Sequence, residues 1–195
     1  SPTIEEKIGK IRAGRPVATH SLYYKGEIRN LDVYEVPTSL LRFNYVNGRI
    51  GTEVREFERS SGTNLDQLGP NEINDKIHDW IWKKSERENK ETLIDIRDKR
   101  QIIPGVITRD GIVVSGNRRF MIARKLNKEG LNRQFLTVVL DDTYADGGDN
   151  ELQIKKLETE LQLGQDEKVK YGAIEKYVTI MDFVDKYIEV ESPQM

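Results

Sequence analysis

The sequence contains no cysteine and only two histidines, His20 and His78. The lack of cysteine excludes disulfide bonds, thiol nucleophiles and cysteine-ligated zinc, and two histidines alone are too few for a usual zinc site. No apolar run approaches the roughly 18 residues that a membrane-spanning helix needs, and no signal peptide is evident. These absences predict a cytoplasmic protein without membrane segments and without cysteine or zinc chemistry.

The sequence also lacks an excess of charge of either sign. Charged residues make up 33% of the 195 residues and hydrophobic residues 36%, yet the formal net charge is only −2. Such a chain has no overall basic field, so tight non-specific DNA binding by this chain alone is not expected. Its length is sufficient for one domain with a substantial core and an appendage.

β-rich segments alternate with segments of helical periodicity, which is typical of an α/β (α+β) fold with a small mixed sheet flanked by helices. The predicted strands are residues 28–36, 102–108, 112–115 and 135–140. The predicted helices are residues 72–84, 117–129, 150–163 and 173–189. We therefore expect an appended N-terminal helix (1–15), a core (16–145) and a C-terminal helical segment (146–195).

Three local patterns refine this expectation. Thr3 and Glu6 have the spacing of a helix-capping box. Asn71 is the expected cap of the helix at 72–84. Residues 51–69 are charged and polar with scattered apolar residues, and the stretch SSGTNLDQLGPNE (60–72) predicts a mobile loop.

The strongest functional signal lies in residues 101–126. Asp110-Gly111 between two β-branched runs predicts a hairpin, after which Gly116 ends a strand where a helix begins. A helix N-terminus exposes unpaired N–H groups, and Arg118 and Arg119 add guanidinium donors suited to phosphate. The pattern predicts a phosphate site, with an ordinary solvated arginine pair as the alternative, and Arg119 is expected to brace the turn by pairing with an acidic residue. Neither a Walker loop nor a G-x-G-x-x-G motif is present.

The stretch IIPGVITRDGIVVSGNRRFMIARKL resembles the core of the ParB/sulfiredoxin-like superfamily. In ParB-type proteins a strand leads to a G-E-R-R-x-x-A box on a strand-to-helix turn. Here the box runs from Gly116 to Ala123, with Asn117 in place of the usual Glu. Residues 36–50 are similar to the family's opening strand and its N-P-x-Q-P-R turn, with Arg49 in the Arg place.

A third motif, in residues 158–177, is similar to the family's E-N-x-Q-R pattern with informative departures. Gln162 matches the Gln, Glu160 replaces the Asn that helps to hold Mg²⁺, and Leu163 replaces the Arg. A Glu can still ligate Mg²⁺, which prefers oxygen ligands, but the loss of the Arg removes a phosphate contact. Helix surface residues without a function are the alternative for Glu160.

The resemblance, which spans about residues 31–178, implies a ParB-like nucleotide-binding domain. It implies slow Mg²⁺-dependent hydrolysis of CTP or ATP in a DNA-associated system, such as partition, a mobile element or phage defence. The implied nucleotide-binding residues are Arg49, Thr108, Ser115, Gly116, Asn117, Arg118 and Arg119. Glu160 and Gln162 are the implied catalytic residues, Glu160 would also hold the metal ion, and the segment 146–195 would complete the site.

Other function classes stay open at this point. A nuclease or phosphotransferase could use the same scaffold, and a non-catalytic protein-interaction module could keep only the fold. A sulfiredoxin is excluded because its catalytic cysteine is absent. About 20 residues follow Ile174, too few for a complete helix-turn-helix, so any DNA contact is expected to be indirect or made through missing or partner domains. A homodimer is a separate partner expectation.

Overall fold

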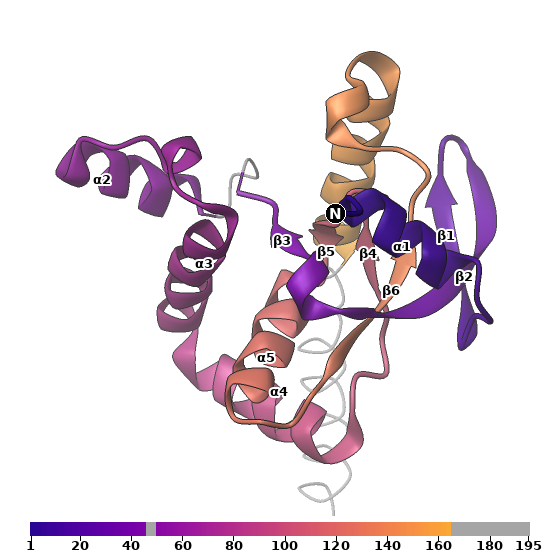
Figure 1. Cartoon of the computed structure of the whole chain (residues 1–195), viewed down its shortest axis with the longest axis horizontal. Helices are drawn as coiled ribbons and strands as arrows, with labels where there is room; N and C mark the ends of the chain where they lie inside the picture. Colours follow the sequence, from indigo (N-terminus) through magenta and orange to yellow (C-terminus); the bar gives the residue numbers. More distant parts are fainter. Residues whose placement is uncertain (46–49, 165–195) are drawn as a thin grey trace, which may run out of the picture. The chain divides into compact units, whose positions relative to one another are not determined.

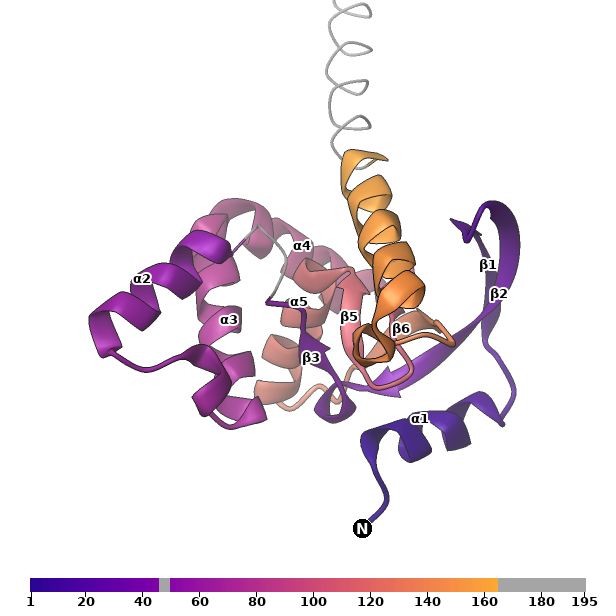
Figure 2. The ribbon, with the colours of Figure 1, turned by 90° about the horizontal axis from the view of Figure 1, so that it is seen from above.

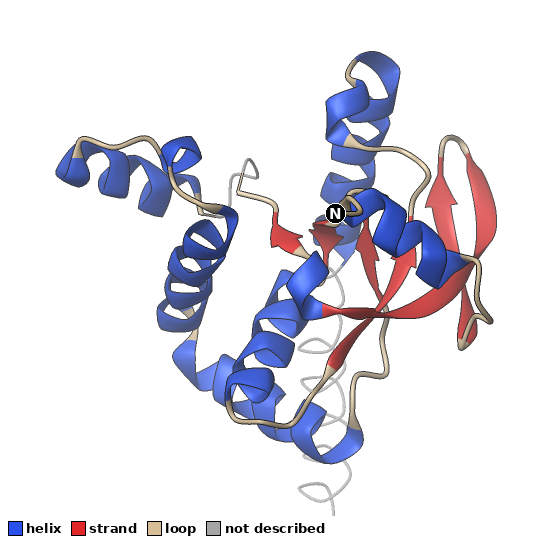
Figure 3. Ribbon diagram, in the orientation of Figure 1, coloured by secondary structure: helices blue, strands red, loops and turns tan. Residues whose placement is uncertain are grey.

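The computed structural model describes residues 1–45 and 50–164 and confirms a mixed α/β fold (Figures 1 and 3). The chain divides into two compact units, Ser1–Lys155 and Lys156–Met195. The helices are α1 (Ile4–Arg12), α2 (Gly51–Ser61), α3 (Pro70–Lys84), α4 (Glu86–Lys99) and α5 (Asn117–Lys128), and residues 148–164 are also helical. The strands are β1 (Ala18–Tyr24), β2 (Glu27–Pro37), β3 (Arg42–Phe43), β4 (Gly105–Ile107), β5 (Ile112–Ser115) and β6 (Gln134–Val139). The helix predicted at 173–189 lies outside the described residues.

The six strands form one mixed sheet in the order β1-β2-β6-β4-β5-β3. The hairpin β1–β2 continues antiparallel onto β6, and β6 runs parallel to β4. β4 and β5 form the predicted antiparallel hairpin, and β5 runs parallel to β3. Gly111 closes the β4–β5 turn with a φ of 88°, and a Cβ atom there would collide with the carbonyl oxygen of Leu40, so the turn requires glycine.

α5 is the central helix of the core. Its buried side chains, Phe120, Met121, Ile122, Ala123 and Leu126, lie against the sheet and the neighbouring helices. The ring of Phe120 lies 4.6 Å from that of Phe43 and 5.8 Å from that of Phe135, measured between centroids. Figure 2 shows α2, α3, α4 and α5 gathered on one side, with α1 apart from them. Within residues 1–45 and 50–164, no helix is both long and apolar enough to span a membrane.

Before β4 the structure contains two helices that were not predicted from the sequence, and α3 begins with a different cap. The charged stretch from residue 51 forms α2, where Phe57 packs against Trp80 at 6.0 Å and carries the amino group of Lys76 over its ring. From residue 62 to residue 69 the loop expected at 60–72 does lie between α2 and α3. Asn71 does not cap α3, which has Gly69 as its N-cap and Pro70 in its first turn.

The helix predicted at 72–84 is confirmed as α3, which ends at Lys84. A further helix that was not predicted, α4, follows after Ser85, and the side-chain amide of Asn89 donates to the carbonyl oxygens of Ile81 and Trp82 at the end of α3.

The strand predicted at 102–108 begins only at Gly105, so the first three residues of that prediction are also wrong. The side chain of Gln101 takes the position that a pairing backbone would occupy. Its amide donates to the carbonyl oxygen of Leu136 at 2.8 Å and accepts from the N–H of Leu136 at 2.9 Å. As a result, residues 102–104 leave the sheet, and Ile102 and Ile103 are exposed.

Candidate functional site: the beginning of helix α5

The turn between β5 and α5 depends on two glycines that approach each other. Gly116 is the N-cap residue of α5 and adopts a left-handed conformation (φ 97°, ψ 23°). A Cβ atom at this position would lie 3.1 Å from the ring of Phe135 and 3.3 Å from the Cα atom of Gly105. The carbonyl oxygen of Gly116 then accepts the first helical hydrogen bond, from Phe120 N–H at 2.9 Å. Only glycine combines this backbone angle with this close packing.

The first turn of α5 contains no acidic residue. Its N-cap residue, Gly116, has no side chain that could accept a hydrogen bond from the first N–H groups of the helix. The first N–H groups of a helix have no partner inside the helix, and they form the positive end of its dipole. Within the part of the chain that the structure describes, the beginning of α5 therefore presents N–H donors to which an anion can bind.

Arg118 and Arg119 extend from this turn in different environments. Arg118 is exposed, and no ion pair joins it to any of the residues that the structure describes. Arg119 is half-buried and donates a long hydrogen bond (3.5 Å) from Nη2 to the carbonyl oxygen of Pro104. Its Nε is buried and meets no acceptor within the described ranges, and burial lowers the pKa of its guanidinium.

The acidic partner expected for Arg119 is absent from the described part of the chain, so that prediction is wrong there. Pro104 supplies only a neutral carbonyl oxygen. Beside the arginines, the amide oxygen of Asn117 is also buried without a donor among residues 1–45 and 50–164. Ser115 ends β5 directly before the turn and is half-buried. The structure thus brings Ser115, Asn117 and the two arginines together around Gly116.

Thr108 lies away from this cluster, at the opposite end of the hairpin. Its side chain is buried, and its hydroxyl donates to Asp110 at 2.5 Å and accepts from the N–H of Ile112 at 3.0 Å. The length of β5, about 10 Å for three residue steps, separates it from Gly116. Thr108 therefore stabilises the turn, and the geometry gives it no place beside a ligand at α5.

The structure does not describe the position of Arg49, Glu160 or Gln162 relative to α5. Arg49 lies outside the described residues. Glu160 and Gln162 belong to the second unit, in which the side chain of Gln162 donates to Glu158 at 3.4 Å. No group of three or more His, Asp or Glu side chains suited to a metal ion occurs within residues 1–45 and 50–164.

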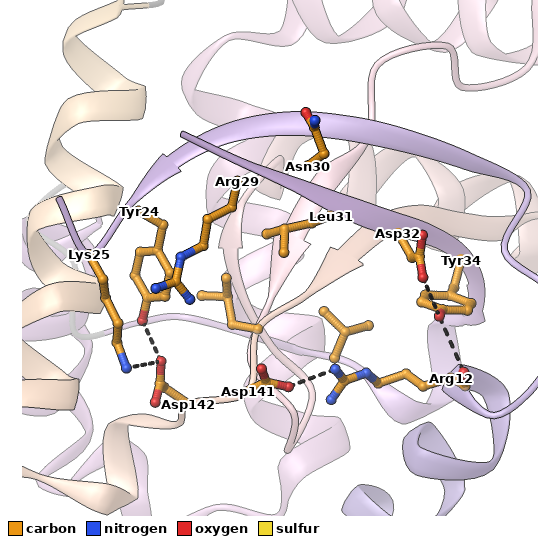
Figure 4. A pocket seen from close by; sticks show the side chains of 12 residues that line it. Arg12, Tyr24, Lys25, Arg29, Asn30, Leu31, Asp32, Tyr34, Asp141 and Asp142 are labelled. Atoms are coloured by element: carbon orange, nitrogen blue, oxygen red, sulfur yellow. Dashed lines mark hydrogen bonds and ion pairs between the residues drawn. The ribbon is translucent and has the colours of Figure 1, made fainter. Parts of the chain in front are cut away.

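A second feature, which the sequence did not reveal, is a cavity of about 230 Å³ beside the end of β6 (Figure 4). Asp142 accepts from the hydroxyl of Tyr24 and from Lys25, both at 2.8 Å. Asp141 pairs with Arg12 at 2.6 Å. Burial and the neighbouring Asp142 raise the pKa of Tyr24 well above its ordinary value.

The charged side chains that line this cavity therefore largely neutralise one another. Their ion pairs join α1, the β1–β2 hairpin and the end of β6. An acidic end to the strand at 135–140 is visible in the sequence, but the partners lie more than a hundred residues away, and no local pattern identifies them.

Comparison with known proteins adds no relative, because no family model, no curated protein and no solved structure matches the chain.

Proposed function

We propose that the beginning of α5 binds the phosphate groups of a nucleoside triphosphate. The observation that carries this proposal is Arg119, a half-buried guanidinium at an uncapped helix N-terminus with no acidic partner among the described residues. A charge removed from water without a counter-ion is costly, and a bound anion would offset that cost. Charge-assisted bonds from arginine to phosphate are among the stronger hydrogen bonds.

Each part of the site would contact the phosphate groups from a different direction. The N–H groups after Gly116 would donate to one phosphate group, as helix N-termini commonly do. Arg119 would approach from the side of Pro104, and Arg118 from the solvent. Because Gly116 has no Cβ atom, a phosphate group could approach the backbone closely at this position. Arg49, Glu160 and Gln162 enter the proposal on the sequence resemblance alone.

Hydrolysis at such a site would be slow and would depend on charge stabilisation and positioning. The first turn of α5 offers no carboxylate to act as a general base. The described residues do not form a metal cage, so we derive no step through a protein-bound ion. Mg²⁺ enters as a partner of the nucleotide phosphates, which is how this ion is usually carried into nucleotide sites.

CTP and ATP are the nucleotides that we propose, in a DNA-associated system. This part of the proposal is supported by the GNRR box and its resemblance to the G-E-R-R box of ParB-type proteins, whose position on a strand-to-helix turn corresponds to β5 and α5. Direct DNA binding by the chain is not part of the proposal, because the net charge of −2 provides no basic field.

The experiment measures the thermal stability and the dissociation constants of the protein with ATP, CTP, GTP and UTP, each with and without Mg²⁺. A nucleotide at one hundred times its dissociation constant should stabilise the fold by about 2.7 kcal/mol. Arg118→Gln and Arg119→Gln should each weaken binding by about 1.5–3 kcal/mol, the range for hydrogen bonds to charged groups. In Arg118→Gln the free energy of unfolding should stay unchanged, because Arg118 is exposed.

Arg59→Gln is the matched control. Arg59 is exposed on α2 and forms no ion pair with a described residue, so its loss should leave nucleotide binding unchanged. The proposal is wrong if no nucleotide binds, or if both variants at the start of α5 bind as tightly as the parent protein.

A further inference from the structure

Two consecutive isoleucines are exposed beside the proposed phosphate site. Ile102 is 71% exposed and Ile103 is 60% exposed. Pro104 follows them, and its carbonyl oxygen accepts from Arg119 at 3.5 Å. The next residue, Gly105, packs against Gly116. Ile103 is therefore at most roughly 7 Å of chain, two residue steps, from the contact between the two glycines.

This segment is held in place although its side chains face solvent. Gln101 fixes its base through two hydrogen bonds to Leu136 and donates a third to the carbonyl oxygen of Ile103 at 2.9 Å. Pro104 has a fixed φ and restricts the residue before it to extended conformations. A surface that is already ordered loses little entropy when a ligand binds to it.

Resting on the proposed function, we infer that Ile103 and Pro104 form an apolar ledge that receives the flat face of the nucleobase. The ledge and the arginines together match a ligand that is anionic at one end and flat and apolar at the other, which describes a nucleotide. The side chains of Ile103 and Pro104 carry no hydrogen-bonding group. The ledge therefore contacts the face of a base and does not read its edge, so it contributes similarly to purine and pyrimidine nucleotides.

The test compares nucleotides with inorganic triphosphate, which carries the phosphate groups alone. Dissociation constants for ATP, CTP and triphosphate are measured for the parent protein, for Ile103→Ser and for the control Ile94→Ser. Ile94 is a 56% exposed residue of α4. Partial loss of an apolar contact by Ile103→Ser should weaken ATP and CTP about five-fold. Triphosphate binding should not change, and Ile94→Ser should behave like the parent for all three ligands.

The outcomes separate the ledge from the phosphate site. Arg118→Gln should weaken all three ligands, because it acts on the phosphate groups. If Arg118→Gln does so while Ile103→Ser leaves ATP and CTP unchanged, the ledge is refuted and the proposed function stands. An equal loss of triphosphate and nucleotide in Ile103→Ser also refutes the ledge. If the parent protein binds neither nucleotide nor triphosphate, both proposals fail.

Discussion

Helix α5 carries its positive charge in two different ways. Towards its end, Arg124 and Lys128 both pair with Asp75 of α3, at 2.9 and 3.1 Å. At its beginning, Arg118 and Arg119 have no acidic partner in the described ranges. The difference cannot come from helix propensity, because all four are good helix formers on one helix. It comes from what contacts each end: α3 supplies the carboxylate of Asp75, whereas the loop before β4 supplies the carbonyl oxygen of Pro104.

The turn between β4 and β5 strengthens this contrast. Arg109 is also an arginine at a turn near the sheet edge, but it pairs with Glu5 at 2.7 Å and with Asp146 at 2.8 Å. Arg109 stabilises contacts between distant segments, as Arg12 does in the cavity. An arginine that is already paired within the chain has less capacity for a ligand. Arg118 and Arg119, which have no acidic partner among residues 1–45 and 50–164, are thus the better candidates for binding.

The largest expected effect comes from a substitution that disrupts the packing of β4 against the start of α5. In Gly105→Ala, the new Cβ atom would collide with the ring of Phe135, lying 2.7 Å from its Cε1 atom and 2.8 Å from the carbonyl oxygen of Ser115. Overpacking of this kind costs up to about 3 kcal/mol. We expect the free energy of unfolding in urea to fall by that amount and the nucleotide site to be lost.

Gly9→Ala is the control for this substitution. Gly9 lies inside α1, and a Cβ atom there would meet nothing within 4 Å. Because alanine is the better helix former, the protein should gain about 0.5–1 kcal/mol. If the two glycine variants were equally stable, the close packing of β4 against the start of α5 would be wrong.

A smaller effect is expected from breaking the paired end of α5. Arg124 is only 13% exposed and donates to Asp75 and, at 2.7 Å, to the carbonyl oxygen of Asn74. Arg124→Gln should lower the free energy of unfolding by about 2 kcal/mol, since hydrogen bonds to charged groups contribute in that range. Nucleotide binding, measured by calorimetry, should be unchanged. A variant with normal stability and weakened binding would reverse the roles that we assign to the two ends.

Much of the fold could be predicted from the sequence, because local patterns determine it. Thr3 and Glu6 form the expected capping box of α1. The hairpin at Asp110-Gly111 and the helix after Gly116 occur where turn chemistry and periodicity indicate. The prediction failed where a distant contact replaces a local one. Ile102 and Ile103 are β-branched and therefore predict a strand. In the structure, however, the side chain of Gln101 forms the hydrogen bonds to Leu136 of β6.

The candidate site was predictable only in part, for a related reason. The sequence shows that Arg118 and Arg119 follow Gly116 at a helix start, but it cannot show whether an acidic residue faces them. Thr108 illustrates the opposite error. It lies in the same stretch, but its hydroxyl is used by Asp110 and Ile112. Whether a polar side chain is free depends on neighbours that only the fold brings together.

The smallest expected effect concerns His78, which packs near the paired end of α5. His78 is 7% exposed, and burial, followed by the nearby charges of Arg124 and Lys128, lowers its pKa to about 4. The fold thus favours the neutral imidazole. Below a pH of about 6.5, the unfolded chain takes up a proton that the folded chain does not. Stability is therefore complete above pH 6.5 and is lost as the pH falls towards 4.

By pH 5 this linkage should remove about 1–2 kcal/mol from the free energy of unfolding. His78→Gln should reduce the acid sensitivity by that amount relative to the parent. The comparison between variants is needed because carboxylates also titrate in this range. Arg124→Gln should raise the pKa of His78 by removing a like charge, as an NMR titration of its ring protons would show. A His78 that titrates near pH 6.5 in the parent protein would mean that the paired end of α5 does not cover it.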